Sequence, residues 1–220
     1  MVTIKNSKNV MKLHGKVKAI ASIFSSLLGQ TKNLRKKDPP ATSAAEIVNR
    51  HYTPTSSKTL SLDLGCGSNP RNPFQATKSF GVDIRGDLER SISQADLSIE
   101  PIPFGDNTFD FCTAFDFIEH IPRNSYPQGK PRLAFLELMN EIYRVLKPGG
   151  MLLHFTPAFP AKEAFQDPTH VNIITKDTMP DYFCEPKSWA KIYGFNGSFE
   201  LIEQRWVSSK WLIGIMRALK

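Results

Sequence analysis

A glycine-rich turn at residues 65–67 is the clearest candidate for binding a small molecule. It follows Leu60–Leu64, whose apolar character predicts a buried strand. Gly65 and Gly67 permit backbone dihedrals, or a close approach to a ligand, that a Cβ atom would forbid. In the dinucleotide fingerprint G-x-G-x-x-G a third glycine would stand where this chain has Pro70. The turn therefore favours a nucleotide-like ligand other than a nicotinamide or flavin cofactor.

Two aspartates further along the chain could recognise the sugar and base of such a ligand. Asp83 lies 20 residues after Asp63, the span of one strand, a turn, a helix and the next strand. At the end of a second strand its carboxylate can accept hydrogen bonds from both ribose hydroxyls, although such an aspartate also serves as a turn residue. Asp96 can accept a hydrogen bond from an adenine amino group while Leu97 packs on the ring.

His170 and Asp167 lie in a polar segment, residues 165–172, that follows the fifth predicted strand. A histidine in such a place can take a proton from a hydroxyl group, with a neighbouring carboxylate orienting it. The alternative is that Asp167-Pro168-Thr169 forms a turn and His170 packs within it. The segment is thus a candidate for proton transfer.

The remaining histidines and the cysteines do not indicate a metal site. The three cysteines are Cys66, Cys112 and Cys184. They lack C-x-x-C spacing, so neither a disulfide framework nor a zinc site is predicted, which fits a reducing cytoplasm. Glu119 and His120 follow a predicted strand and are as readily structural as functional. His154 alternates within a strand, and we expect it to be packed.

A parallel sheet would hold these residues in place. Strand and helix patterns alternate from Leu60 onward, which is typical of a parallel sheet with helices on both faces. The predicted strands span residues 60–64, 79–84, 95–97, 109–115 and 151–155, and the predicted helices span 43–51 and 131–147. Two apolar runs, 199–207 and 210–219, are predicted to form a final β-hairpin rather than a membrane anchor at 211–216.

The positive charge of the chain belongs to its first 37 residues. They hold nine of the 28 Lys and Arg residues and no acidic residue, so the remainder carries 19 basic against 21 acidic side chains. Residues 17–28 have apolar positions at helical spacing, which predicts a short basic amphipathic helix. Residues 16–37 could lie on an anionic membrane surface, or the helix could dock on a partner or cover the domain. We expect a cytoplasmic protein, peripheral at the inner face of the membrane in the first case.

Five segments, taken in order, resemble the motifs of class I S-adenosylmethionine-dependent methyltransferases. They are residues 62–67, Asp83, residues 96–97, residues 109–120 and residues 146–150. The resemblance covers about residues 59–157. It implies an α/β fold, a Rossmann-like three-layer sandwich with a seven-stranded, mostly parallel sheet and an antiparallel last strand. The methyltransferase domain would span residues 41–220, after a basic extension over residues 1–40.

The resemblance also implies S-adenosylmethionine as the cofactor and assigns its contacts. Asp63 would face the ammonium group, Gly65 and Gly67 the methionine and ribose, and the backbone of Phe115 and Asp116 the methionine moiety. The full set of implied cofactor residues is Asp63, Gly65, Cys66, Gly67, Asp83, Ile84, Asp96, Leu97, Phe115 and Asp116. This cofactor has no phosphate, so the turn need not bind an anion and Pro70 is acceptable.

The implied activity is in-line transfer of a methyl group to an oxygen or nitrogen nucleophile. The acceptor would be a small molecule or a lipid- or saccharide-linked compound, because D-P-T-H segments similar to residues 167–170 occur in methyltransferases of bacterial surface polysaccharide and lipid biosynthesis. Orientation carries most of such a reaction, and a base is needed only when the acceptor must lose a proton. Two alternatives are an RNA methyltransferase with a basic arm and a non-catalytic binding protein. Nucleic acid is disfavoured, because this chain lacks the Asn/Asp-Pro-Pro-aromatic segment that amino-directed base methyltransferases usually carry after the fourth strand.

Overall fold

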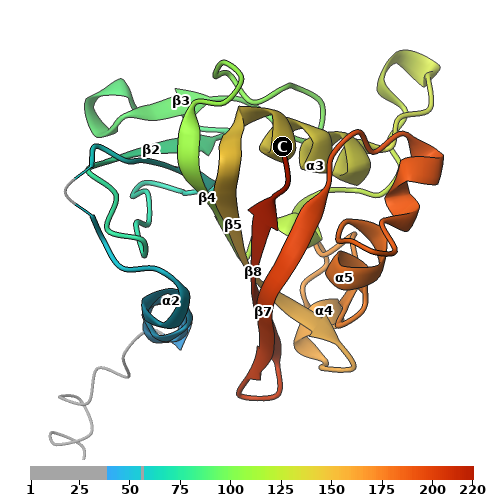
Figure 1. Cartoon of the computed structure of the whole chain (residues 1–220). Helices are drawn as coiled ribbons and strands as arrows, with labels where there is room; N and C mark the ends of the chain where they lie inside the picture. The colour runs from blue at the N-terminus through green and yellow to red at the C-terminus, as the bar shows by residue number, and fades with distance from the viewer. Residues whose placement is uncertain (1–38, 56) are drawn as a thin grey trace, which may run out of the picture. The chain divides into compact units, whose positions relative to one another are not determined.

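One central β-sheet organises the part of the chain that the structure, a computed structural model, describes, namely residues 39–55 and 57–220 (Figure 1). The strand order is β3-β2-β1-β4-β5-β8-β7, and β6 pairs with β5 beside this path. The strands are β1 (Leu60–Leu64), β2 (Lys78–Asp83), β3 (Ile92–Gln94), β4 (Phe109–Phe115), β5 (Leu146–Phe159), β6 (Ile174–Thr175), β7 (Phe199–Val207) and β8 (Trp211–Ala218).

Helices cover both faces of this sheet. The α-helices are α2 (Pro39–His51), α3 (Ala134–Val145), α4 (Glu163–Gln166) and α5 (Thr178–Tyr182). Four short 3-10 helices are η1 (Leu88–Arg90), η2 (Ile118–His120), η3 (Pro127–Gly129) and η4 (Trp189–Tyr193). Figure 1 shows α2 on one side of the sheet and α3, α4 and α5 on the other. The predicted three-layer α/β architecture is confirmed.

The direction of the last strand is also as predicted. Strands β1 to β5 pair in parallel, whereas β8 runs antiparallel to both β5 and β7. A turn at Ser208–Ser209, with φ angles of 51° and 54°, joins β7 to β8 in the expected hairpin. Residues 211–216 therefore belong to a sheet strand and not to a membrane anchor.

Two apolar clusters lie on the two faces of the sheet. On one face the stripe of α3, including Leu138, Met139 and Ile142, packs in a cluster with residues of β1, β2 and β4. On the other face Ile47 and Val48 of α2 join a second cluster with residues of β4, β5 and β8. Strand β4 is almost wholly buried between them, which its sequence FDFCTAF allows because both of its faces are largely apolar.

The predicted helix between β1 and β2 is absent. Residues 65–77 cross from β1 to β2 as a loop with no helix. Pro70 and Pro73 explain this difference, because proline interrupts the backbone hydrogen bonds of a helix interior. The side chain of Asn72 instead hydrogen-bonds both the backbone N–H and the carbonyl of Ala76, and Phe74 fills the core in place of a helix.

Some element boundaries also differ from the predicted ones. The third strand is Ile92–Gln94 and not residues 95–97, so Asp96 and Leu97 lie beyond its end. Helix α2 begins at Pro39, four residues before the predicted start, because proline is accommodated in the first turn of a helix. Strand β5 is longer than predicted at both ends.

The predicted amphipathic helix within residues 17–28 lies outside the described residues. Residues Pro39–Lys220 form one compact unit, and the predicted domain over residues 41–220 stays a prediction. No helix within residues 39–55 and 57–220 is both long and apolar enough to cross a bilayer.

Phe74→Ala tests whether the loop after β1 is part of the core. The Phe74 ring is fully buried and stacks on Phe111, with centroids 4.3 Å apart. We expect the variant to lose about 3–5 kcal/mol of unfolding free energy in urea denaturation. The matched control Phe165→Ala removes a ring that is 54% exposed, and should cost at most about 1 kcal/mol. Equal losses in the two variants would contradict this description of the loop.

Candidate functional site

The turn after β1 exposes backbone beside an aspartate of the neighbouring strand. Gly65 and Gly67 both have a φ of +62°, a conformation that disfavours any residue with a Cβ atom. The backbone N–H of Gly65 donates to the Val82 carbonyl at 2.8 Å, and that of Gly67 donates to Oδ2 of Asp83 at 2.9 Å. A Cβ atom at Gly67 would meet no atom of the described chain within 4 Å, so open space lies next to Asp83.

The space above Gly65 is filled by a protein ring. A Cβ atom at Gly65 would lie 2.2 Å from Cδ2 of Phe117, so the ring rests directly on the glycine backbone. Phe117 follows Asp116, which has a φ of +47° and donates its backbone N–H to the Phe155 carbonyl at 2.8 Å. The two predicted glycines therefore face different surroundings: open space at one and an aromatic ring at the other.

Asp63 is enclosed by donors of its own chain. Its carboxylate is 1% exposed and accepts hydrogen bonds from the Thr113 hydroxyl at 2.6 Å and from the backbone N–H of Arg71 at 2.8 Å. Burial raises the pKa of this carboxyl to about 6, because desolvation outweighs the hydrogen bonds and the Arg71 charge, which lower it. Asp63 thus ties β1 to β4 and to the loop that follows the turn.

Asp83 and Ile84 present a polar and an apolar group at the end of β2. Oδ1 of Asp83 accepts from the backbone N–H of Arg85 at 3.0 Å and from its Nε at 3.3 Å. Each carboxylate oxygen has two lone pairs, so Oδ2, which accepts only from Gly67 among the described residues, can accept a further hydrogen bond. Ile84 is 62% exposed. Open space at Gly67, acceptor capacity at Asp83 and exposed apolar surface at Ile84 fit an adenosine-type ligand.

The other cofactor residues that the sequence predicts are less open to a ligand. Oδ1 of Asp96 accepts from the backbone N–H and the hydroxyl of Ser98, at 3.0 and 2.6 Å, in a local turn. Leu97 and Phe115 are buried in the two apolar clusters. Burial raises the pKa of the Cys66 thiol to about 12, with Asp63 and Asp83 adding to the effect, so Cys66 is a neutral thiol.

Glu119 is a buried carboxyl group beyond the end of β4. It is 1% exposed, and Oε2 accepts from the Thr156 hydroxyl at 2.9 Å, whereas Oε1 has no hydrogen-bond partner among the described residues. Burial raises the pKa of Glu119 to about 8, and the charges of Asp116 and Asp167 act in the same direction. The sequence showed Glu119 only as one of a pair of residues after a strand.

His170 lies beside Glu119 and His120, although about 50 residues separate them in sequence. The rings of His120 and His170 meet edge to face, with centroids 4.8 Å apart. The backbone N–H groups of Val171 and Asn172 both donate to the Glu119 carbonyl, at 3.0 and 2.9 Å, and so hold the two segments together. The candidate proton-transfer residue thus stands at the end of β4, where Asp116 also lies.

Asp167 contacts His170 only at long range. Oδ2 of Asp167 is 4.0 Å from Nε2 of His170, beyond a hydrogen bond. Oδ1 of Asp167 instead accepts from the backbone N–H and the hydroxyl of Thr169, at 2.8 and 2.7 Å. Residues 167–169 therefore form a local turn, with the His170 ring packed against His120. His154, by contrast, is fully buried in β5 as predicted, and its burial lowers its pKa to about 4.

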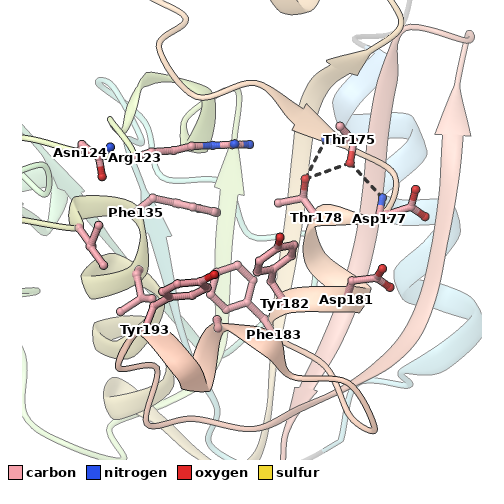
Figure 2. Close-up of a pocket in the computed structure, with 13 residues that line it drawn as sticks. Arg123, Asn124, Phe135, Thr175, Asp177, Thr178, Asp181, Tyr182, Phe183 and Tyr193 are labelled. Atoms are coloured by element: carbon pink, nitrogen blue, oxygen red, sulfur yellow. Dashed lines mark hydrogen bonds between the residues drawn. The ribbon is translucent and has the colours of Figure 1, made fainter.

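A cavity of about 440 Å³ opens between α3 and the segment that contains α5 (Figure 2). Most of its lining is apolar, with Phe135 from α3 and Tyr182 and Phe183 from the opposite side. Arg123 at its edge donates from Nε to Oδ1 of Asn172 at 2.8 Å. Arg123 thus connects the cavity to the segment that carries His170, although no residue of that segment or of the glycine turn lines it.

Comparisons with known proteins agree with this geometry. A family model described as a methyltransferase domain matches residues 62–154, which include the glycine turn, Asp83 and Glu119. No curated protein matches the sequence.

Several solved structures share the fold. The cyclase SpnF has 17% identity and a TM-score of 0.54, with 81% of this chain and 80% of that chain covered. A methyltransferase from Aquifex aeolicus has 14% identity and a TM-score of 0.52, with 87% and 98% covered. The 1,6-didemethyltoxoflavin N1-methyltransferase of Burkholderia thailandensis, with S-adenosylhomocysteine bound, has 16% identity and a TM-score of 0.51, with 94% and 90% covered. At these identities the likeness establishes the fold.

Asp63→Asn tests the burial of charge beneath the turn. The folded protein holds a proton on Asp63 up to about pH 6, whereas the unfolded chain releases it near pH 4, so this group lowers stability as pH rises between those values. We expect the decrease in unfolding free energy from pH 4 to pH 7 to be about 2–3 kcal/mol smaller in the variant than in the wild type. Urea denaturation at both pH values measures it.

Asp106→Asn is the matched control for this comparison. The side chain of Asp106 is 69% exposed, and its substitution should leave the pH dependence of stability as in the wild type. An Asp63→Asn variant whose stability follows pH as the wild type does would refute the assignment.

Proposed function

We propose that this chain, which belongs to the class I S-adenosylmethionine-dependent methyltransferases, methylates an oxygen or nitrogen nucleophile of a small-molecule or lipid- or saccharide-linked acceptor. The observation that carries the proposal is that His170 is held beside Glu119, on the segment after β4 whose Phe117 ring rests on Gly65 of the glycine turn. This edge of a parallel sheet is where α/β folds of this type bind their ligands.

The residues at the ends of β1 and β2 would hold the cofactor. Asp83 would accept hydrogen bonds from the ribose hydroxyls, while Gly67 offers backbone that no side chain covers. Ile84 would pack on the adenine, and Asp63 beneath the turn would fix the backbone that meets the methionine part. When bound, S-adenosylmethionine supplies a methyl group that is already electrophilic, so the chain has mainly to orient the acceptor.

His170 would handle the proton of a hydroxyl acceptor. Its side chain is 10% exposed, and its ring is fixed against His120 by the contacts that tie residues 169–172 to Glu119. A fixed imidazole can take the proton that a hydroxyl loses as it attacks. Asp167, 4.0 Å away, would stabilise the resulting imidazolium through its charge.

The remainder of the acceptor would enter the cavity between α3 and α5. Its volume of about 440 Å³ lies in the range of small-molecule sites, and its walls combine aromatic rings with the charged groups of Arg123, Asp177 and Asp181 (Figure 2). An acceptor with an apolar part and a polar head suits such a lining. A lipid-linked acceptor would lie at a membrane surface, which the cationic residues 16–37 would favour if the surface is anionic.

Asp83→Ala tests the cofactor site. We expect isothermal titration calorimetry with S-adenosylhomocysteine to show binding to the wild type and an affinity at least tenfold lower in the variant, because about 1.5–3 kcal/mol is typical of hydrogen bonds to a charged group. Asp106→Ala, a substitution of an exposed aspartate outside the site, should bind as the wild type does. Equal binding by both variants would reject Asp83 as a ligand of the ribose.

His170→Ala tests the proton-transfer role. With a hydroxyl acceptor we expect kcat/KM to fall by about 10²-fold or more, while the affinity for S-adenosylhomocysteine stays unchanged. His51→Ala is the control, because His51 pairs with Glu203 through α2 and β7 and is remote in sequence from the site. Unchanged turnover by His170→Ala would remove this residue from the reaction.

A further inference from the structure

Glu119, His120 and His170 together form a set of metal-binding groups. One ligand atom from each of the three side chains lies within 4.8 Å of the other two. One carboxylate and two imidazoles are the donors that first-row divalent cations accept, and three protein ligands leave coordination positions open. The set is assembled from two segments, residues 118–120 and 167–172, that only the folded chain brings together.

We propose that Glu119, His120 and His170 bind one first-row divalent cation, such as Zn²⁺, Mn²⁺ or Fe²⁺, beside the end of β4. Bonds of about 2.0–2.2 Å to one ion would draw the three ligand atoms closer than their present separation. The exposed segment around His120 and Thr169 leaves room for this adjustment. The open coordination positions could take an oxygen ligand.

The atoms needed for this site have no other partners. Oε1 of Glu119 and Nδ1 of His170 are buried and make no hydrogen bond within the described chain. His120 makes its hydrogen bonds to residues 39–55 and 57–220 through Nδ1, which leaves Nε2 available. A buried polar atom without a partner costs free energy, and a cation would satisfy all three atoms at once.

The opposite atom is hydrogen-bonded in Glu119 and His120, as a metal ligand requires, whereas that of His170 has only the charge of Asp167 nearby. The Thr156 hydroxyl donates to Oε2 of Glu119 at 2.9 Å, and Nδ1 of His120 lies 3.0 Å from the Thr169 hydroxyl and 3.2 Å from the Thr169 carbonyl. Nε2 of His170 faces Asp167 at 4.0 Å. Outer groups of this kind fix the tautomer and orientation of ligating histidines and carboxylates. The site is therefore supported around its ligands as well as at them.

The cation and the proton compete for His170. A nitrogen lone pair that holds a cation cannot also accept a proton, so the base role proposed above belongs to the cation-free cluster. With a cation bound, an oxygen ligand would be acidified by the cation itself. The metal-site proposal depends on the geometry of the three side chains and not on the proposed reaction. Metal binding can therefore be measured without turnover.

Equilibrium binding of Zn²⁺ and Co²⁺ to the full chain, stripped of metal by a chelator, tests the proposal. We expect one Zn²⁺ per chain with a Kd in the micromolar range or tighter, and visible absorption bands of bound Co²⁺ that Zn²⁺ abolishes. Glu119→Gln, His120→Ala and His170→Ala should each weaken binding at least about tenfold. Asp167→Asn should weaken binding less, because Asp167 acts on His170 only through its charge at 4.0 Å.

Two controls keep the result interpretable. His51→Ala removes a histidine that pairs with Glu203 on another part of the sheet and should bind metal as the wild type does. Because Glu119 is buried and its variant could misfold, the partly exposed His120 and His170 provide independent tests in chains whose circular dichroism matches the wild type. Absence of saturable binding by the wild type, or binding that survives His120→Ala and His170→Ala, would overturn the assignment.

Discussion

Parallel pairing of β1 with its two neighbours is the constraint on which the site depends. The register sets Asp63 opposite Thr113 on β4 and brings the end of β2 beside the turn that leaves β1. A buried carboxylate then joins β1 to β4 through the Thr113 hydroxyl, while Asp83 receives the N–H of Gly67. A shift of one residue would turn each of these side chains to the opposite face of the sheet. The open backbone at Gly67 is therefore a product of strand register as much as of glycine.

The chain reaches this arrangement with few helices between its strands. Only α3 is a full helix between two parallel strands of the main path, and the crossover from β1 to β2 is a loop whose Phe74 fills the core. The candidate residues for proton transfer lie instead on irregular segments after β4 and β5, which are joined by the hydrogen bonds to the Glu119 carbonyl. Structures that share this fold include one described as a cyclase and others described as methyltransferases, so the fold alone does not determine the reaction.

The sequence predicted the elements whose pattern is strong. Strand β4 and the hairpin of β7 and β8 were located by apolar runs, and the antiparallel last strand followed from the family resemblance. The helix after Gly67 was predicted wrongly, because spacing alone cannot show that Asn72 and two prolines favour a loop. The third strand is only three residues long, too short to carry a periodic signal.

The candidate cofactor residues could be identified from the sequence more readily than the contacts of the candidate acceptor residues. Gly67 and Asp83 are 16 residues apart and lie in consecutive motifs, whereas His170 meets Glu119 across about 50 residues. No local pattern encodes such a contact. Burial also leaves Oε1 of Glu119 without a hydrogen-bond partner among the described residues. The position of Glu119 and His120 after a predicted strand does not reveal this burial.

The ring of Phe117 on Gly65 gives that position two separate reasons to stay glycine. One is steric, since a Cβ atom would collide with the ring, and the other is conformational, since the backbone has a positive φ. Shortening residue 117 would relieve only the first. The two positions therefore differ for protein engineering. Residue 117 can be varied to change the volume above the turn, but residue 65 must remain glycine after that change because of its positive φ.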